Sequence, residues 1–221
     1  MPRYSHRFVD HIEFPHAAGK AVCVGRNYAD HAKELGNEIP TSPLLFIKPG
    51  TAMVAMAEPL ALPEGLGACH HELEMALLIG QPLSRAAPKE SRAAIAGIGL
   101  ALDLTLRELQ DELKKKGQPW ERAKAFDGAC PLAEFVVFDQ ALDFSSLTLR
   151  LSRNGIVQQQ GSCGDMLFSV ENLLSEISHS FSLMPGDVVL TGTPAGVGPL
   201  SSGDHLLAEL GDFLRVETVV R

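Results

Sequence analysis

The sequence predicts an α+β fold that is rich in β-structure, with a mixed, largely antiparallel sheet and a few short helices. Predicted strands outnumber predicted helices, and the predicted hairpins lie mostly in the second half of the chain. Glycine (20) and proline (14) are slightly enriched among the 221 residues, which favours a turn-rich chain over a helix bundle. Because no linker or repeat divides the chain, we expect one domain over residues 1–221, with 1–18 as a short N-terminal extension.

In the first half of the chain, local signals predict two helices among strands. Asn27 is a good N-cap for a helix over 28–35. Thr105 and Glu108 form a capping box for a helix that runs to Lys116, where three consecutive lysines and a following glycine are stop signals. Short apolar runs predict strands over 21–24, 44–47 and 72–79, and a further strand that ends at 100–103.

The second half of the chain is dominated by hairpin signals. Asn154-Gly155 lies between two apolar segments, 147–152 and 156–160, and predicts a type I′ turn. Apolar residues at helical spacing predict a helix over 166–177. The remaining apolar runs predict strands over 187–190, 205–210 and 214–220.

Charge and cysteine content restrict the class of partner and the compartment. The net charge is −8 and the only basic run is 114–116, so we expect no nucleic-acid partner. An anionic substrate would need a local positive charge, which a metal ion could supply. Four cysteines without a metal-binding or redox spacing predict reduced thiols. No signal peptide or membrane-spanning run is present in this sequence, and we expect a cytoplasmic protein without a membrane partner.

Three acidic residues near the ends of apolar strands are the most informative feature. Glu72 and Glu74 share one face of a predicted strand, about 7 Å apart, and both faces of that strand become apolar beyond them. Asp103 ends a second apolar strand. Buried carboxylates repel each other and need a cation, and three oxygen ligands suit Mg²⁺, Mn²⁺ or Ca²⁺ better than zinc. Solvated glutamates, a helix-capping role for Asp103, and an iron site that includes His70 remain alternatives.

A second group combines a histidine with a carboxylate. His31 and Glu34 are three residues apart and therefore neighbours on a helix. A carboxylate beside an imidazole fixes its tautomer and raises its basicity, as a general base requires, although a surface ion pair has the same spacing. Lys124 is a further candidate, with a plain surface lysine as the alternative. The glycine-rich segment 192–198 could present backbone N–H groups to a carboxylate or could be a simple turn.

Together these segments resemble the fumarylacetoacetate hydrolase family over residues 22 to about 200. The resemblance is carried by CVGRNYADH (23–31), FIKP (46–49), HHELE (70–74), ALDLT (101–105), KAFD (124–127), QGSCGDM (160–166) and PGDVVLTGTPAGVG (185–198). It implies a rolled, β-rich fold, a homodimer, and a divalent metal ion held by Glu72, Glu74 and Asp103. It also implies catalytic roles for His31, Glu34 and Lys124. Substrate-binding positions of the small acylpyruvase and oxaloacetate-decarboxylase branch match Arg26, Lys48, Arg107, Gln110 and Thr193.

The resemblance implies a magnesium-dependent enzyme that acts on small 2-oxoacids through a metal-bound enolate, with Mn²⁺ or Ca²⁺ as alternative ions. Hydrolysis of the C–C bond of an acylpyruvate such as fumarylpyruvate is our first expectation. Keto–enol tautomerisation or decarboxylation of oxaloacetate is the alternative, because the same enolate serves all three reactions. A non-catalytic 2-oxoacid-binding module would keep the three acids but would not need His31 or Lys124.

Overall fold

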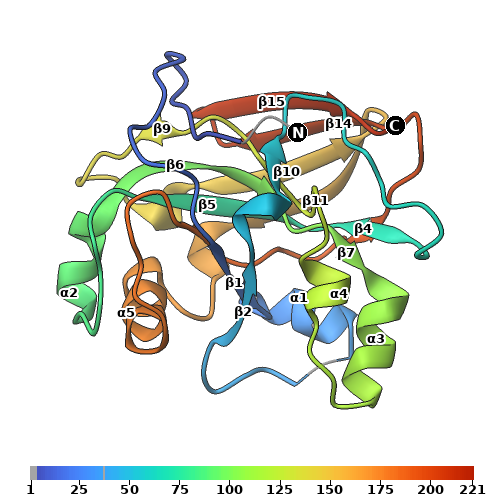
Figure 1. Ribbon diagram of the computed structural model, residues 1–221, viewed down its shortest axis with the longest axis horizontal. Coiled ribbons are helices and arrows are strands. Elements are labelled where there is room, and N and C mark those ends of the chain that lie inside the picture. Colours follow the sequence, from blue (N-terminus) through green and yellow to red (C-terminus); the bar gives the residue numbers. More distant parts are fainter. Residues whose placement is uncertain (1–3, 37) are drawn as a thin grey trace.

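The computed structural model describes residues 4–36 and 38–221, and its main feature is a curled mixed sheet that runs through the centre of the molecule (Figure 1). Parallel pairs at two places interrupt an otherwise antiparallel sheet, which confirms the predicted class. The strand order is β2 (Leu44–Lys48), β1 (Ala21–Gly25), β12 (Val188–Leu190), β5 (Leu73–Ile79), β6 (Ile95–Leu102), β8 (Cys130–Leu132) and β3 (Met53–Ala55), with β9 (Val136–Val137) against β6.

Two smaller antiparallel sheets complete the β-structure. One has the order β11 (Ile156–Ser162), β10 (Thr148–Arg153), β14 (His205–Leu210) and β15 (Leu214–Val219). The other has the order β13 (Gly198–Pro199), β4 (Cys69–His71) and β7 (Thr105–Leu106). Asn154 and Gly155 both have positive φ, 53° and 78°, as a type I′ turn requires, so the predicted hairpin is confirmed.

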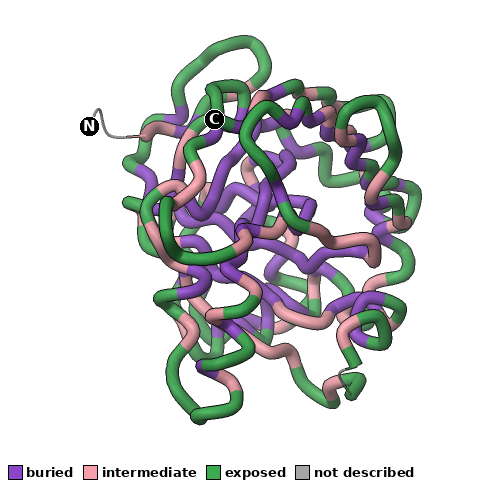
Figure 2. Tube along the Cα trace, turned by 90° about the vertical axis from the view of Figure 1, so that its right-hand side faces the viewer, coloured by how far each residue is buried: buried purple, intermediate pink, exposed green. Residues whose placement is uncertain are grey.

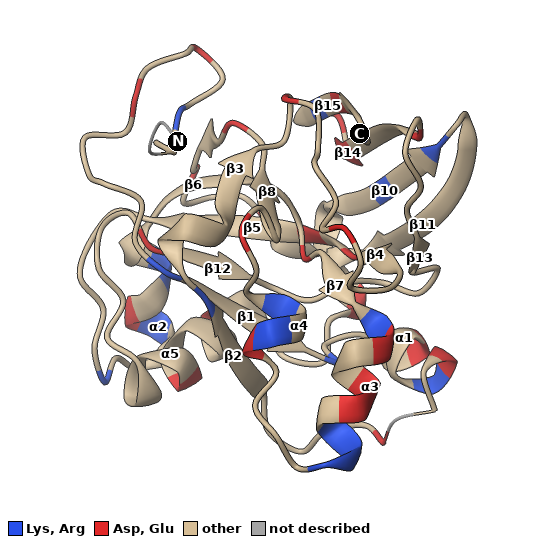
Figure 3. Cartoon of the chain, turned by 45° about the vertical axis from the view of Figure 1, so that its right-hand side comes forward, with Lys and Arg blue, Asp and Glu red and all other residues tan. Residues whose placement is uncertain are grey.

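The helices gather in two groups at opposite ends of the sheet (Figures 1 and 3). The first group consists of α1 (Ala29–Glu34), α3 (Arg107–Lys115) and α4 (Glu121–Lys124). The second consists of α2 (Pro88–Ser91) and α5 (Val170–Ser180). Single 3₁₀ turns occupy Gly50–Ala52, Arg92–Ala94, Phe144–Ser146 and Cys163–Asp165. Among the described residues, none of the helices has the length and apolar character needed to cross a bilayer.

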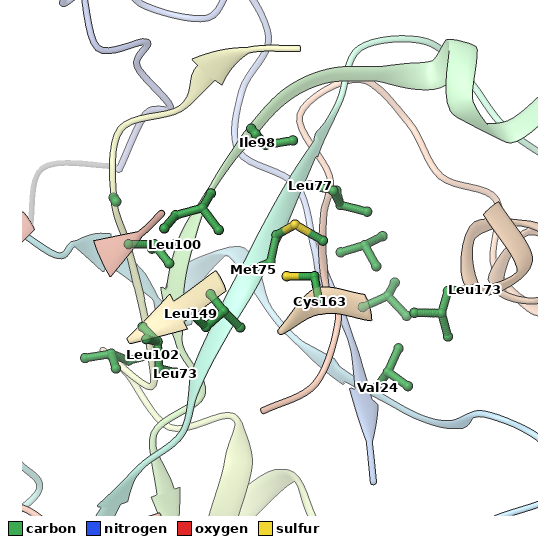
Figure 4. Packing of buried hydrophobic residues seen from close by; sticks show 14 of the residues in the cluster. Val24, Leu73, Met75, Leu77, Ile98, Leu100, Leu102, Leu149, Cys163 and Leu173 are labelled. Carbon is green, nitrogen blue, oxygen red and sulfur yellow. The ribbon is translucent and has the colours of Figure 1, made fainter. Parts of the chain in front are cut away.

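Strand β5 lies in the middle of the core and is buried on both faces, as expected from its unbroken apolar run. Met75 and Leu77 pack on one side with β10, β14 and α5, whereas Ala76 and Leu78 face the other side with β1, β12 and Phe135. Figure 4 shows the first of these layers, and Figure 2 shows that buried backbone fills the centre of the molecule. This double burial means that the polar groups at the end of β5 are also removed from water.

Two predicted helix caps are wrong, because both side chains bond to distant segments instead. Helix α1 begins at Ala29, and the Asn27 side chain donates to the Thr191 carbonyl (2.8 Å) and accepts from the Phe168 backbone N–H (2.9 Å). Helix α3 begins at Arg107 without a side-chain cap. Thr105 Oγ1 faces the acidic residues, where it accepts a hydrogen bond from Lys124 (2.7 Å).

Two predicted element boundaries also differ from the structure. The strand predicted over 72–79 begins one residue later, at Leu73, because Glu72 lies in the break between β4 and β5. The helix predicted over 166–177 begins only at Val170, after the N-cap Ser169, whose hydroxyl accepts from the Asn172 N–H. Met166 instead forms an isolated bridge with Tyr28, which ties the start of α1 to the segment before α5.

Candidate metal-dependent active site

The three predicted acidic residues meet in one buried cluster. Glu72, Glu74 and Asp103 each offer a carboxylate oxygen, and these oxygens all lie within 4.8 Å of one another. All three residues are at most 4% exposed. The cluster forms because β5 and β6 are antiparallel neighbours with Leu73 opposite Leu102, so that Glu72 and Asp103 leave the strands side by side. Burial of three carboxylates at this distance requires compensating positive charge.

Two lysines and an arginine supply part of that charge. Lys124 Nζ donates to Glu72 Oε2 (2.9 Å), Asp103 Oδ2 (2.6 Å) and Thr105 Oγ1 (2.7 Å), which uses all three of its protons. Lys48 is completely buried behind the cluster, where its ammonium lies 2.7 Å from Asp103 Oδ1. The Arg107 guanidinium pairs with the remaining oxygen of Glu72.

These neighbours act in opposite directions on the two glutamates. Burial by itself would raise the pKa of Glu72, but the charges of Lys124 and Arg107 outweigh it and hold this pKa well below its usual range. Burial and the negative charges of Asp103 and Glu72 raise the pKa of Glu74 well above its usual range. The Gly192 N–H, which donates to Glu74 Oε2 at 2.6 Å, and the charge of Lys124 oppose this rise in pKa without cancelling it. Glu74 is therefore the acid that still lacks a cation.

The donor set fits a hard divalent cation. It consists of carboxylate oxygens alone, which are the ligands that Mg²⁺ and Mn²⁺ prefer. Asp103 Oδ1 is buried and accepts no hydrogen bond with good geometry from the described residues, although it pairs with the Lys48 charge. This oxygen and the undercompensated Glu74 are available to such an ion. Within residues 4–36 and 38–221, Glu72, Glu74 and Asp103 form the one group of this kind, and His70 is outside it.

His31 and Glu34 form the expected pair at the pocket. His31 is 5% exposed, and its Nδ1 lies 3.3 Å from Glu34 Oε2. Glu34 is in turn held by the Gly196 backbone N–H, at 3.0 and 3.2 Å from its two oxygens. Burial lowers the pKa of His31 below its usual value, although the charges of Glu72 and Glu34 oppose this shift. The segment 192–198 thus presents N–H groups to carboxylates of the protein itself, those of Glu74 and Glu34.

Sequence reasoning missed Gln159, which ties the cluster to strand β11. Gln159 is 1% exposed, and its Oε1 accepts from the Leu73 N–H and from His71 Nδ1, each at 3.0 Å. Its Nε2 donates to Thr193 Oγ1 (2.7 Å) and to the Pro194 carbonyl (2.9 Å). The two acceptor contacts are made by the residues on either side of Glu72. The middle one of three consecutive glutamines, 158–160, gives no sequence signal for such a role.

One pocket brings together most of the residues that the sequence singled out. It is lined by predicted site residues from five segments: Arg26, His31, Glu72, Glu74, Arg107, Gln110, Lys124 and Thr193. Glu34 does not line the pocket itself but contacts His31, which does. Asp103 and Lys48 pair with each other outside the pocket lining. The pocket is also lined by Lys114, Trp120 and the apolar side chains of Leu35, Leu44 and Phe46, which the sequence reasoning did not select.

A buried acidic cluster and a histidine–carboxylate pair on one pocket are the groups that a metal-dependent acid–base enzyme would need. The profile of the fumarylacetoacetate hydrolase C-terminal domain matches residues 20–221. The chain belongs to the fumarylacetoacetate hydrolase family, as its motifs had indicated.

Similar proteins include oxaloacetate tautomerases and a fumarylpyruvate hydrolase. An oxaloacetate tautomerase of Escherichia coli (strain K12) is 52% identical over 196 residues, which cover 88% of this chain and 89% of the relative. A mitochondrial oxaloacetate tautomerase of Homo sapiens is 40% identical over 187 residues, 85% of each chain. The crystal structure of fumarylpyruvate hydrolase from Pseudomonas aeruginosa, in complex with Mn²⁺ and pyruvate, superposes with a TM-score of 0.92 at 30% identity, covering 100% of this chain and 96% of the other.

Proposed function

We propose that this protein is a divalent-metal-dependent oxaloacetate tautomerase, which moves a proton between C3 and the C2 oxygen of its substrate. The observation that carries the proposal is the likeness, at 40–52% identity over 85% or more of each chain, to relatives of that name from bacteria and mammals. The site supports it, because a buried base faces a cluster that can hold a cation. The order of our two expectations from sequence is therefore reversed, with tautomerisation ahead of hydrolysis.

His31 is the proposed base of the reaction. Its Nδ1–H donates to Glu34, which leaves Nε2 as the unprotonated nitrogen of the neutral ring. Because burial favours the neutral imidazole, His31 can accept a proton near neutral pH. In tautomerisation, Nε2 takes the proton from C3 or from the enol oxygen and returns it to the other atom. Glu34, held by the Gly196 N–H, keeps the ring in one tautomer and orientation.

Glu72, Glu74 and Asp103 would hold Mg²⁺, with Mn²⁺ as the alternative that the Pseudomonas structure suggests. When bound, the ion supplies Lewis-acid stabilisation of negative charge on the 2-oxo oxygen. Lys124 and Arg107 hold the two oxygens of Glu72, and Lys124 also holds Asp103. These contacts orient the carboxylates.

Of the remaining predicted residues, Arg107, Gln110 and Thr193 have proposed roles in substrate binding. Lys48 does not, because it is fully buried, pairs with Asp103 and does not line the pocket. Arg107 Nη1 donates to Gln110 Oε1 (2.8 Å), and this pair lines the pocket next to Glu72. Thr193 Oγ1 donates to the Leu73 carbonyl (2.8 Å) and lines the pocket beside Glu74. We place the 2-oxoacid end of the substrate between these side chains. The single domain over 1–221, the homodimer and the cytoplasmic location stay predictions from the sequence.

Hydrolysis of an acylpyruvate is the second candidate, and the structural likeness to fumarylpyruvate hydrolase favours it. The same His31 would then take a proton from water rather than from carbon. At 30% identity that likeness is weaker than the 52% identity to the Escherichia coli tautomerase, so we rank it second.

An assay of purified protein with Mg²⁺ separates the candidates. A tautomerase accelerates the loss of enol absorbance from oxaloacetate without releasing pyruvate. Release of pyruvate from oxaloacetate would identify a decarboxylase, and cleavage of fumarylpyruvate into pyruvate and fumarate would identify a hydrolase. An absence of enol loss above the uncatalysed rate would refute the proposed function.

A further inference from the structure

Lys114 differs in its surroundings from the two lysines that follow it. It lies in the last turn of α3, and sequence reasoning assigned all three lysines to the end of that helix. Lys115 and Lys116 are exposed, whereas Lys114 is only partly exposed and lines the same pocket as Glu72 and His31. Its ammonium lies 5.5 Å from the centre of the Trp120 ring, which also lines the pocket, so a cation–π contact holds the charge at the pocket wall.

Arg26 is a second cation that lines the pocket. It lies between β1 and α1 with φ of 59°, a left-handed conformation that costs a non-glycine residue free energy. Helices α1 and α3 lie side by side in Figures 1 and 3, and residues of both helices line the pocket. Arg26 and Lys114 are both among the residues that line it.

These two cations are not used by the acidic cluster. Arg107 and Lys124 pair with Glu72, and Lys124 and Lys48 pair with Asp103. Lys114 has only a long contact to Asp111 Oδ1 (3.7 Å), and no side-chain ion pair joins Arg26 to another described residue. Burial lowers the pKa of Lys114, and the positive charges of Arg107, Arg26 and Lys124 act in the same direction. A negative charge between the cations would relieve this repulsion.

We propose that Lys114 and Arg26 form an anion-binding pair that takes the distal carboxylate of a four-carbon 2-oxo dicarboxylate. The inference rests on the proposed function, because it assumes that the 2-oxoacid end of the substrate lies at the acidic cluster. The pair would make the enzyme selective for dicarboxylates over 2-oxo monocarboxylates of similar size. Loss of one charge-assisted hydrogen bond to a carboxylate weakens binding by about tenfold to a hundredfold.

The test is the variant Lys114→Met, compared with Lys115→Met as a matched control in the same helix. We expect Lys114→Met to raise KM for oxaloacetate at least tenfold, with the inhibition constant of pyruvate within twofold of wild type, because pyruvate lacks the distal carboxylate. Lys115→Met leaves both values unchanged, and Lys114→Arg restores most of the affinity. An unchanged KM in Lys114→Met, or an equal rise in both constants, would overturn the proposal.

A binding experiment separates this proposal from the proposed function. Malate and lactate also differ by the distal carboxylate, and calorimetry with the magnesium-loaded protein measures their affinities without turnover. We expect wild type to prefer malate and Lys114→Met to lose that preference, even if the protein fails to tautomerise oxaloacetate. Equal affinities in wild type, or no binding of malate, would reject the anion-binding pair while leaving a measured tautomerase activity intact.

Discussion

The substitution Gln159→Leu tests how much the buried network beside Glu72 contributes to the protein. Leucine is similar in size but removes the acceptor of the Leu73 N–H and of His71 Nδ1, both of which are buried. Each buried donor left without a partner costs about 1–3 kcal/mol, so the free energy of unfolding should fall by about 2–6 kcal/mol. Thr193 Oγ1 keeps its own donation to the Leu73 carbonyl, and we add no loss for it.

Urea unfolding followed by circular dichroism measures this loss as a shift of the midpoint at constant slope. Gln160→Leu is the matched control, because Gln160 is the exposed neighbour and its replacement should change stability by less than about 0.5 kcal/mol. Calorimetric titration with Mg²⁺ should also show weaker binding in Gln159→Leu, since His71 and Leu73 flank Glu72. Equal midpoints for Gln159→Leu and wild type would refute the reasoning.

Three further predictions concern the proposed chemistry. His31→Ala should lower kcat by about 10²–10⁴-fold. Calorimetry should find its affinity for Mg²⁺ within twofold of wild type. Unaltered turnover would show that His31 is not the base. The pH profile of kcat/KM should fall on the acid side with a midpoint below about 6.5, because burial lowers the pKa of His31 and the neutral ring is the active form. Glu34→Gln should move that midpoint further down, since it removes a charge that raises the pKa, and a rise would contradict the assignment. Chelation of divalent ions should abolish activity, and added Mg²⁺ or Mn²⁺ should restore it. Mg²⁺ at a hundred times its Kd should stabilise the wild-type protein by about 2.7 kcal/mol but should not stabilise Asp103→Asn. Equal thermal shifts in the two proteins would argue against the acidic cluster as the metal site.

Local sequence signals predicted those parts of the fold that depend on near neighbours. The Asn154-Gly155 turn needs only two residues with positive φ, and both have it. The caps assigned to Asn27 and Thr105 failed because their partners are remote in sequence. Asn27 bonds to a carbonyl 164 residues away, and Thr105 accepts a bond from a lysine 19 residues later. Good capping residues are also good buried hydrogen-bonding residues, and local spacing does not distinguish the two uses.

The candidate site was predictable to the extent that its chemistry lies in charged side chains. Carboxylates beside apolar strands are unusual in any sequence, because their burial requires compensation. Gln159 and Lys114 gave no such signal. A neutral amide in a strand and the first of three lysines at a helix end both have ordinary explanations. The pairing of β11 with β10 places Gln159 beside Glu72, and the packing of α3 against α4 places Lys114 at the pocket.

The acidic cluster also carries information about the fold that hydrophobic patterning lacks. Strands β5 and β6 are apolar on both faces, so burial hardly distinguishes one register from another. The observed register places Leu73 opposite Leu102, and the Asp103 N–H donates to the Glu72 carbonyl at 2.8 Å. A slip by two residues that placed Asp103 opposite His70 would keep both strands among apolar neighbours but move Asp103 about 7 Å along the strand, away from Glu72 and Glu74. The ion that we propose for these three acids would therefore favour the observed register, a preference that the apolar pattern of the two strands does not supply.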